Sequence, residues 1–169
     1  MKPLAHVLFA LLLAALQASL LRWVGGGWFS LALLAACVVH QGLHGGNVDG
    51  SVASAGVGYV MDLTAGSTKG LMTALAVLLF IAVRATSAAV DVRSRSAFAL
   101  LSGGGAFLLS AGAMLLVRYT SPPEIAPGAG LLPRMLVEAV LTGALAPLVG
   151  VALRRIDALF QREEAGLLR

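Results

Sequence analysis

Charged residues are scarce in this chain, and long polar stretches are missing. Only 12% of its 169 residues are charged and 59% are apolar, whereas soluble domains have about 25% charged and about 45 to 50% apolar residues. The mean hydropathy is +0.91. No stretch is both polar enough and long enough to form a separate soluble domain. The composition therefore predicts one integral membrane domain over residues 1–169.

Cysteines and paired catalytic side chains are equally scarce. Cys37 is the only cysteine, which excludes an internal disulfide and a cysteine-based metal site. No nucleophile has a base at a spacing typical of catalysis, so we expect neither an enzyme nor a cofactor. The net charge of +4 does not indicate a nucleic-acid partner, because the basic residues are scattered or lie beside helix ends.

Long apolar runs, in contrast, are abundant. A helix that spans a bilayer needs about 20 mostly apolar residues. By this measure the sequence predicts an all-α bundle of six transmembrane helices near 4–22, 28–46, 48–64, 69–90, 96–118 and 131–153. The first run is too long for a secretory signal and has no cleavage site, so we expect it to be retained. The tail over 154–169 is predicted as either an interfacial helix or a frayed terminus.

Lysine and arginine residues predict the orientation. With the amino terminus inside, eight lie on the inner side and four on the outer side, which favours two cytoplasmic termini. The inner set is Lys2, Arg84, Arg93, Arg95, Arg154, Arg155, Arg162 and Arg169, and the outer set is Arg22, Lys69, Arg118 and Arg134. A five-span topology is the alternative. A reporter fused after Arg169 would distinguish the two.

One run of small residues at a spacing of four contains an acid: Ser54, Gly58, Asp62, Gly66 and Gly70. A charge at the centre of a membrane helix costs about 2.5 to 3.5 kcal/mol, so Asp62 should face protein rather than lipid. Small side chains let another helix backbone approach closely. We therefore predict that these five residues form a helix-packing and partner-binding face.

Three intramembrane charges are predicted to lie in the outer leaflet, namely Asp62, Arg134 and Glu138. Such groups mark substrate or ion sites by default. The favoured interpretation is a structural cluster that joins the third predicted helix to the sixth, because no second acid lies at the depth of Asp62. Alternatively, Asp62 caps the following turn through Ser67 or the backbone amides near Gly66.

His40 and His44 are four residues apart and share a helix face, which is the spacing of a zinc-binding pair. No glutamate follows His40, and Asp49 is the only nearby third ligand. We therefore expect interfacial histidines here rather than a metal site.

Two stretches resemble a known family. Residues 58–75, GYVMDLTAGSTKGLMTAL, are similar to the signature hairpin of the bacterial rod shape-determining membrane protein MreD, and residues 144–160, ALAPLVGVALRRIDALF, to its last helix and basic exit. The resemblance implies a non-enzymatic, multi-pass subunit of the cell-elongation machinery in the bacterial inner membrane. It also implies binding to MreC, a single-span protein, and through it to the peptidoglycan polymerase and transpeptidase pair and the actin-like filament.

A second function is an alternative, the substrate-binding membrane subunit of a vitamin-type uptake transporter, which has a similar layout. Such a site needs several convergent polar groups and aromatic rings. This chain has only two tryptophans and two tyrosines. The sequence therefore favours the scaffold over the transporter.

Overall fold

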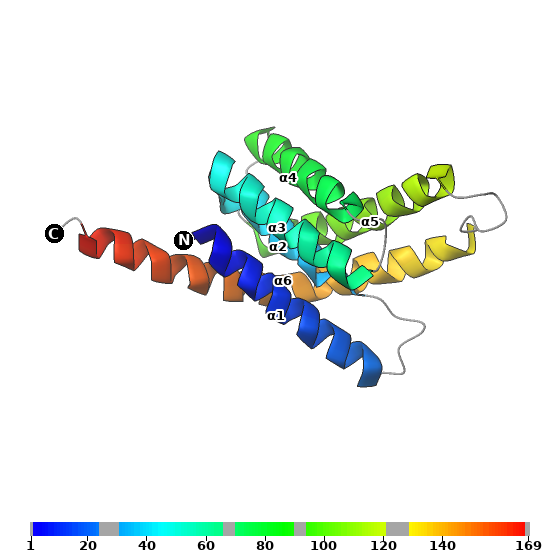
Figure 1. Ribbon diagram of the computed structural model, residues 1–169, viewed down its shortest axis with the longest axis horizontal. Helices are drawn as coiled ribbons and strands as arrows, with labels where there is room; N and C mark the ends of the chain where they lie inside the picture. Colours follow the sequence, from blue (N-terminus) through cyan, green and yellow to red (C-terminus); the bar gives the residue numbers. More distant parts are fainter. Residues whose placement is uncertain (1, 24–30, 66–69, 90–93, 121–128, 168–169) are drawn as a thin grey trace.

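The computed structural model describes residues 2–23, 31–65, 70–89, 94–120 and 129–167, and all secondary structure within these ranges is helical. The predicted all-α class is therefore confirmed (Figure 1). The elements are α1 (Lys2–Trp23), α2 (Leu33–His44), α3 (Asn47–Ala65), α4 (Leu71–Ala89), α5 (Arg95–Thr120), the short 3₁₀ helix η1 (Ala129–Leu131) and α6 (Leu132–Leu167).

Four helices in the described part of the chain are long and apolar enough to cross a membrane. The qualifying segments are Pro3–Leu20, Leu71–Ala88, Arg95–Tyr119 and Leu132–Leu159, in α1, α4, α5 and α6. The protein thus has the character of a membrane protein. Helix α2 has only 12 residues, about 18 Å of helix against a hydrocarbon core of about 30 Å. Helix α3 has 19 residues but is not among these four segments.

Helix α2 lies at the centre of the bundle. Every residue from Leu33 to Gly42 is buried, and α2 packs against α1, α3, α4, α5 and α6. A helix that is apolar all round is expected in such a position. The neighbouring helices surround α2 with protein, so its length does not have to match the thickness of a bilayer.

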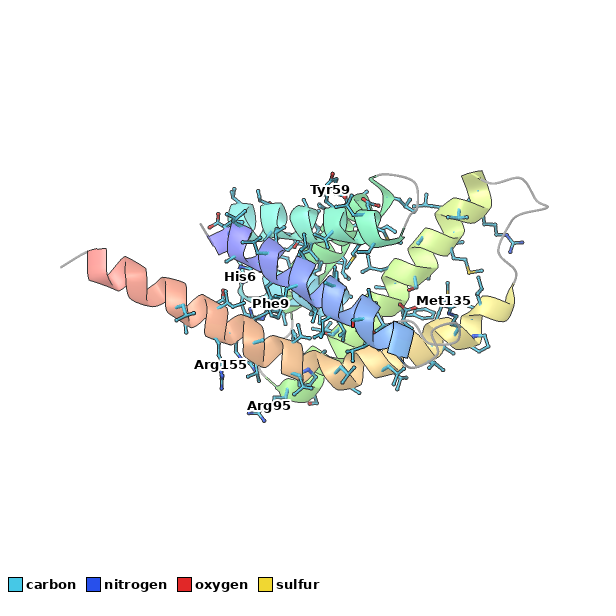
Figure 2. All side chains as sticks on the ribbon, turned by 60° about the horizontal axis from the view of Figure 1, so that its bottom comes forward. His6, Phe9, Tyr59, Arg95, Met135 and Arg155 are labelled. Carbon is cyan, nitrogen blue, oxygen red and sulfur yellow. The ribbon has the colours of Figure 1, made fainter. Side chains whose placement is uncertain are left out.

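The outer helices turn large apolar side chains away from this core. On α1, Leu8, Leu12 and Leu16 are all more than half exposed. On α3, Tyr59 is 60% exposed and points away from the bundle (Figure 2). Exposed leucines in such number suit contact with acyl chains rather than with water.

Helix α6 is much longer than the predicted span over 131–153. It continues to Leu167 as one helix of 36 residues, and its carboxyl-terminal part projects beyond the rest of the bundle (Figure 1). Of the two alternatives for the tail, the helical one therefore holds up to Leu167. Pro147 lies inside this helix, and the residue four positions earlier, whose carbonyl the proline ring approaches, is the small Gly143.

Candidate functional site

The carboxylate of Asp62 binds the amino-terminal end of α4. Its oxygens accept hydrogen bonds from the backbone amides of Gly70, Met72 and Thr73 at 3.0, 2.8 and 3.1 Å, and from the Thr73 hydroxyl at 2.7 Å. The first amides of a helix have no partner within it, and its amino terminus carries a partial positive charge. Asp62, near the end of the preceding helix α3, gives these amides an acceptor and places a negative charge at the positive end of α4.

The predicted small-residue face packs against the same chain. A Cβ on Gly58 would lie 2.6 Å from Thr73 Cα and 2.8 Å from Ala76 Cβ, and Ser54 is completely buried. Gly70 has φ of +91°, a conformation that glycine adopts without steric cost. Gly66 lies outside the described residues. Helix α4 covers this face at Gly58, so the structure shows helix packing within the chain there, and partner binding by these residues stays a prediction.

The predicted cluster of Asp62, Arg134 and Glu138 does not form. Helices α3 and α6 make no contact in the described structure. Glu138 instead accepts a hydrogen bond from the Ser110 hydroxyl at 3.3 Å, and Arg134 is exposed. The amides at the start of α4 are close to Asp62 and need an acceptor, so they take its carboxylate. Of the alternatives left open, capping is the one seen, with backbone donors at Gly70, Met72 and Thr73. The donors named in the prediction, at Ser67 and near Gly66, lie outside the described residues.

Arg84 binds the opposite end of another helix. Its Nη1 donates a hydrogen bond to the carbonyl of Gly45 at 2.8 Å and approaches that of Gly42 at 3.5 Å. These carbonyls end α2, where the helix dipole is negative. The six-span topology predicted that Arg84 lies on the inner side with the other inner lysines and arginines. Its described partner is the buried helix α2.

The amino-terminal end of α2 is also bound by distant residues. Thr142 Oγ1 of α6 accepts a hydrogen bond from the Ala32 amide at 3.1 Å, and the Gln17 side chain of α1 donates to the Leu31 carbonyl. Side chains of other helices therefore bind backbone groups at both ends of the enclosed helix.

A polar cluster joins α1, α2 and α6. His6 Nε2 lies 3.1 Å from Asp157 Oδ1, and His40 Nε2 lies 2.8 Å from Asp157 Oδ2. The His6 and His40 side chains are 5% and 1% exposed. The His44 ring stacks on that of His40, with centroids 4.6 Å apart. Figure 2 shows His6 between α1 and α6.

Sequence analysis found His40 and His44 but missed His6 and Asp157. Asp49, its candidate third ligand, is exposed and is not one of the three clustered ligand groups. His6 lies within the first apolar run and Asp157 in the basic segment near the end, so no linear spacing relates them. Only the crossing of α1 and α6 brings the two together.

A cavity of about 590 Å³ opens beside this cluster. Its lining includes polar side chains and both signs of charge. The titratable and amide side chains on its wall are His6, Gln41, His44, Asp49, Arg154 and Asp157. The cavity can hold water or a small polar ligand next to the two imidazoles.

A second surface lies where α5 and α6 cross. A Cβ on Gly103 would lie 2.8 Å from the Ala139 carbonyl oxygen, and one on Gly143 would lie 3.0 Å from that of Ala99. The two backbones are thus nearly in contact. Outside the crossing lies an apolar groove of about 690 Å³, which we call the α5–α6 groove. Its lining is Ser96, Ala99, Leu100, Gly103, Gly104, Phe107, Leu136, Ala139, Val140, Gly143 and Ala144.

Comparisons with known proteins place this chain in no family. No protein-family model, curated protein or solved structure matches it. Its function is therefore inferred from its own residues and their arrangement.

Proposed function

We propose that the protein is a non-enzymatic scaffold or regulatory subunit of the bacterial rod-shape complex. In this proposal it lies in the inner membrane with six passes and cytoplasmic termini. It binds the transmembrane helix of an MreC-like single-span protein and supports peptidoglycan synthesis during elongation. The observation that carries the proposal is the α5–α6 groove.

The shape of the groove suits a helix. Its lining residues on α5 run from Ser96 to Phe107, a length of roughly 17 Å at 1.5 Å per residue. An elongated apolar groove with small residues on its floor lets the backbone of another membrane helix approach closely, which favours association within lipid. This is the chemistry that a single-span partner offers.

The second support for the proposal is a resemblance to the MreD family, which lies in residues 58–75 and 144–160. The first stretch contains Asp62 and the start of α4, and the second contains Pro147 and Asp157. Because α4 covers the face of Ser54 and Gly58, the proposal assigns the partner to the α5–α6 groove instead.

The described cavities favour a scaffold over a vitamin-type transporter subunit. Besides the polar cavity at the histidines, a cavity of about 340 Å³ is bordered by Gln17, Thr64, Ser110 and Glu138 among mainly apolar residues. The described linings of these two cavities contain no phenylalanine, tyrosine or tryptophan. Sites for small organic molecules combine apolar and aromatic side chains with a few convergent polar groups, and neither of these two cavities has the aromatic part in its described lining.

Gly104→Leu tests the groove directly. A Cβ at Gly104 meets nothing within 4 Å, so the leucine fills the groove without disturbing the bundle. The control is Ala85→Leu, which adds the same bulk at an exposed position of α4. Each variant is co-expressed with a candidate MreC-like single-span protein. We expect Gly104→Leu to lower co-purification about tenfold, the effect of about 1.4 kcal/mol, and the control to retain it.

Equal recovery of the partner with Gly104→Leu and Ala85→Leu would refute the groove as its binding site. Depletion in a rod-shaped host tests the process: rounded cells support a role in wall synthesis. Normal rods that acquire a nutrient requirement would overturn the proposal in favour of uptake.

A further inference from the structure

We propose that His6, His40 and Asp157 bind a divalent transition-metal ion of the zinc class, with a water molecule from the adjoining cavity as a fourth ligand. This inference goes beyond the proposed function and does not depend on it. It concerns the end of the bundle where α1, α2 and α6 meet, whereas the scaffold proposal concerns the α5–α6 groove.

The donor atoms form a compact set. One imidazole nitrogen from each histidine and a carboxylate oxygen of Asp157 all lie within 4.8 Å of one another. Zinc binds histidine nitrogen at about 2.0 to 2.1 Å and carboxylate oxygen at about 2.0 to 2.2 Å, so two tetrahedral ligands lie roughly 3.3 to 3.5 Å apart. His6 Nε2 lies 3.1 Å from Oδ1 and His40 Nε2 lies 2.8 Å from Oδ2 of Asp157, so each imidazole lies within about half an ångström of this spacing from one oxygen of the carboxylate.

Burial makes a metal ion a better partner than protons. A doubly protonated pair would place two cations in positions that are 5% and 1% exposed, and burying a charge is costly. A divalent ion binds the imidazoles in their neutral form and balances the carboxylate. Two nitrogen donors and one oxygen suit zinc, copper, iron or nickel rather than magnesium or calcium, which prefer oxygen alone.

The cavity supplies an open coordination position. His6 and Asp157 both line it, and three protein ligands with one open position are the arrangement of zinc sites that bind water. Gln41 provides an independent sign of a ligand. This residue is 4% exposed and lines the same cavity, and its Nε2 has no hydrogen-bond partner in the described structure. A water molecule on the metal would give that amide an acceptor.

The full-length protein in detergent provides the test, after chelator treatment and re-equilibration with Zn²⁺. We expect elemental analysis to find about one zinc per chain. Asp157→Asn and His6→Asn should each weaken zinc affinity at least 10- to 100-fold, the loss that even outer-shell substitutions cause. Co²⁺ in place of Zn²⁺ should give visible d–d absorption in the wild type, and both variants should lack it.

His44→Asn is the matched control. His44 contacts the same cavity and stacks on His40, but it is not among the three clustered ligand groups, so this variant should keep its zinc. Absence of stoichiometric zinc from the folded wild type would overturn the proposal. The cluster would then be an ion-paired contact that joins the three helices. Equal loss in His44→Asn and Asp157→Asn would overturn the assigned ligands. Co-purification of the single-span partner with the zinc-free variants is measured as well. This measurement distinguishes failure of the metal proposal from failure of the groove hypothesis.

Discussion

Removal of the Asp62 carboxylate should uncouple α4 from α3 and destabilise the protein. Asp62→Ala leaves three backbone amides and one hydroxyl without their acceptor. Loss of a helix cap costs up to about 2 kcal/mol, and loss of a charge at a partly buried helix terminus adds about 1 kcal/mol or more. We therefore expect a loss of about 3 kcal/mol. Asp62→Asn keeps one acceptor oxygen and should lose about half as much.

Thermal unfolding of the full chain in detergent measures this effect. For a chain of this size each kcal/mol corresponds to about 2 to 4 °C, so Tm should fall by about 6 to 12 °C in Asp62→Ala. The control is Asp49→Asn, which removes the same charge at an exposed position of α3 and should change stability by less than about 1 kcal/mol. A Tm for Asp62→Ala within about 2 °C of the wild type would refute the capping role.

Two further substitutions test the other helix contacts. Arg84→Met keeps an unbranched apolar stem but removes the hydrogen bond to the Gly45 carbonyl, and thermal unfolding should reveal a loss of about 2 kcal/mol; an unchanged Tm would contradict the described contact. Gly58→Leu places a side chain against the α4 backbone at Thr73 and should cost about 1 to 3 kcal/mol. Gly104→Leu adds the same side chain in open space and should leave Tm unchanged, so equal losses in these two variants would contradict the packing described for Gly58.

Helix positions were largely predictable from the sequence. The predicted spans 4–22, 69–90 and 96–118 overlap α1, α4 and α5 almost completely, because an apolar run of about 20 residues is itself the signal for a membrane helix. The central helix was not predicted as such. Its apolar run resembles a lipid-exposed span, and only the arrangement of the other helices places it inside the protein.

The polar contacts were less predictable, for a physical reason. The short distance along the chain between Asp62 and the start of α4 allowed capping to be considered, but the pattern of charges favoured a cluster with Arg134 and Glu138. The partner of Arg84 and the joining of His6 to Asp157 depend on how helices cross. A crossing is decided by packing over whole helix faces, which residue spacing does not record.

The enclosure of α2 sets an order for biogenesis. The acceptor for the Ala32 amide is Thr142 of α6, 110 residues further along the chain, so this contact cannot form until the ribosome has synthesised α6 as far as that residue. Until then the nascent chain holds a helix too short to stay in lipid alone, and the insertion machinery has to retain it. Synthesis that stops before α6 therefore leaves α2 without one of the helices that enclose it, and membrane quality-control proteases can recognise such a segment.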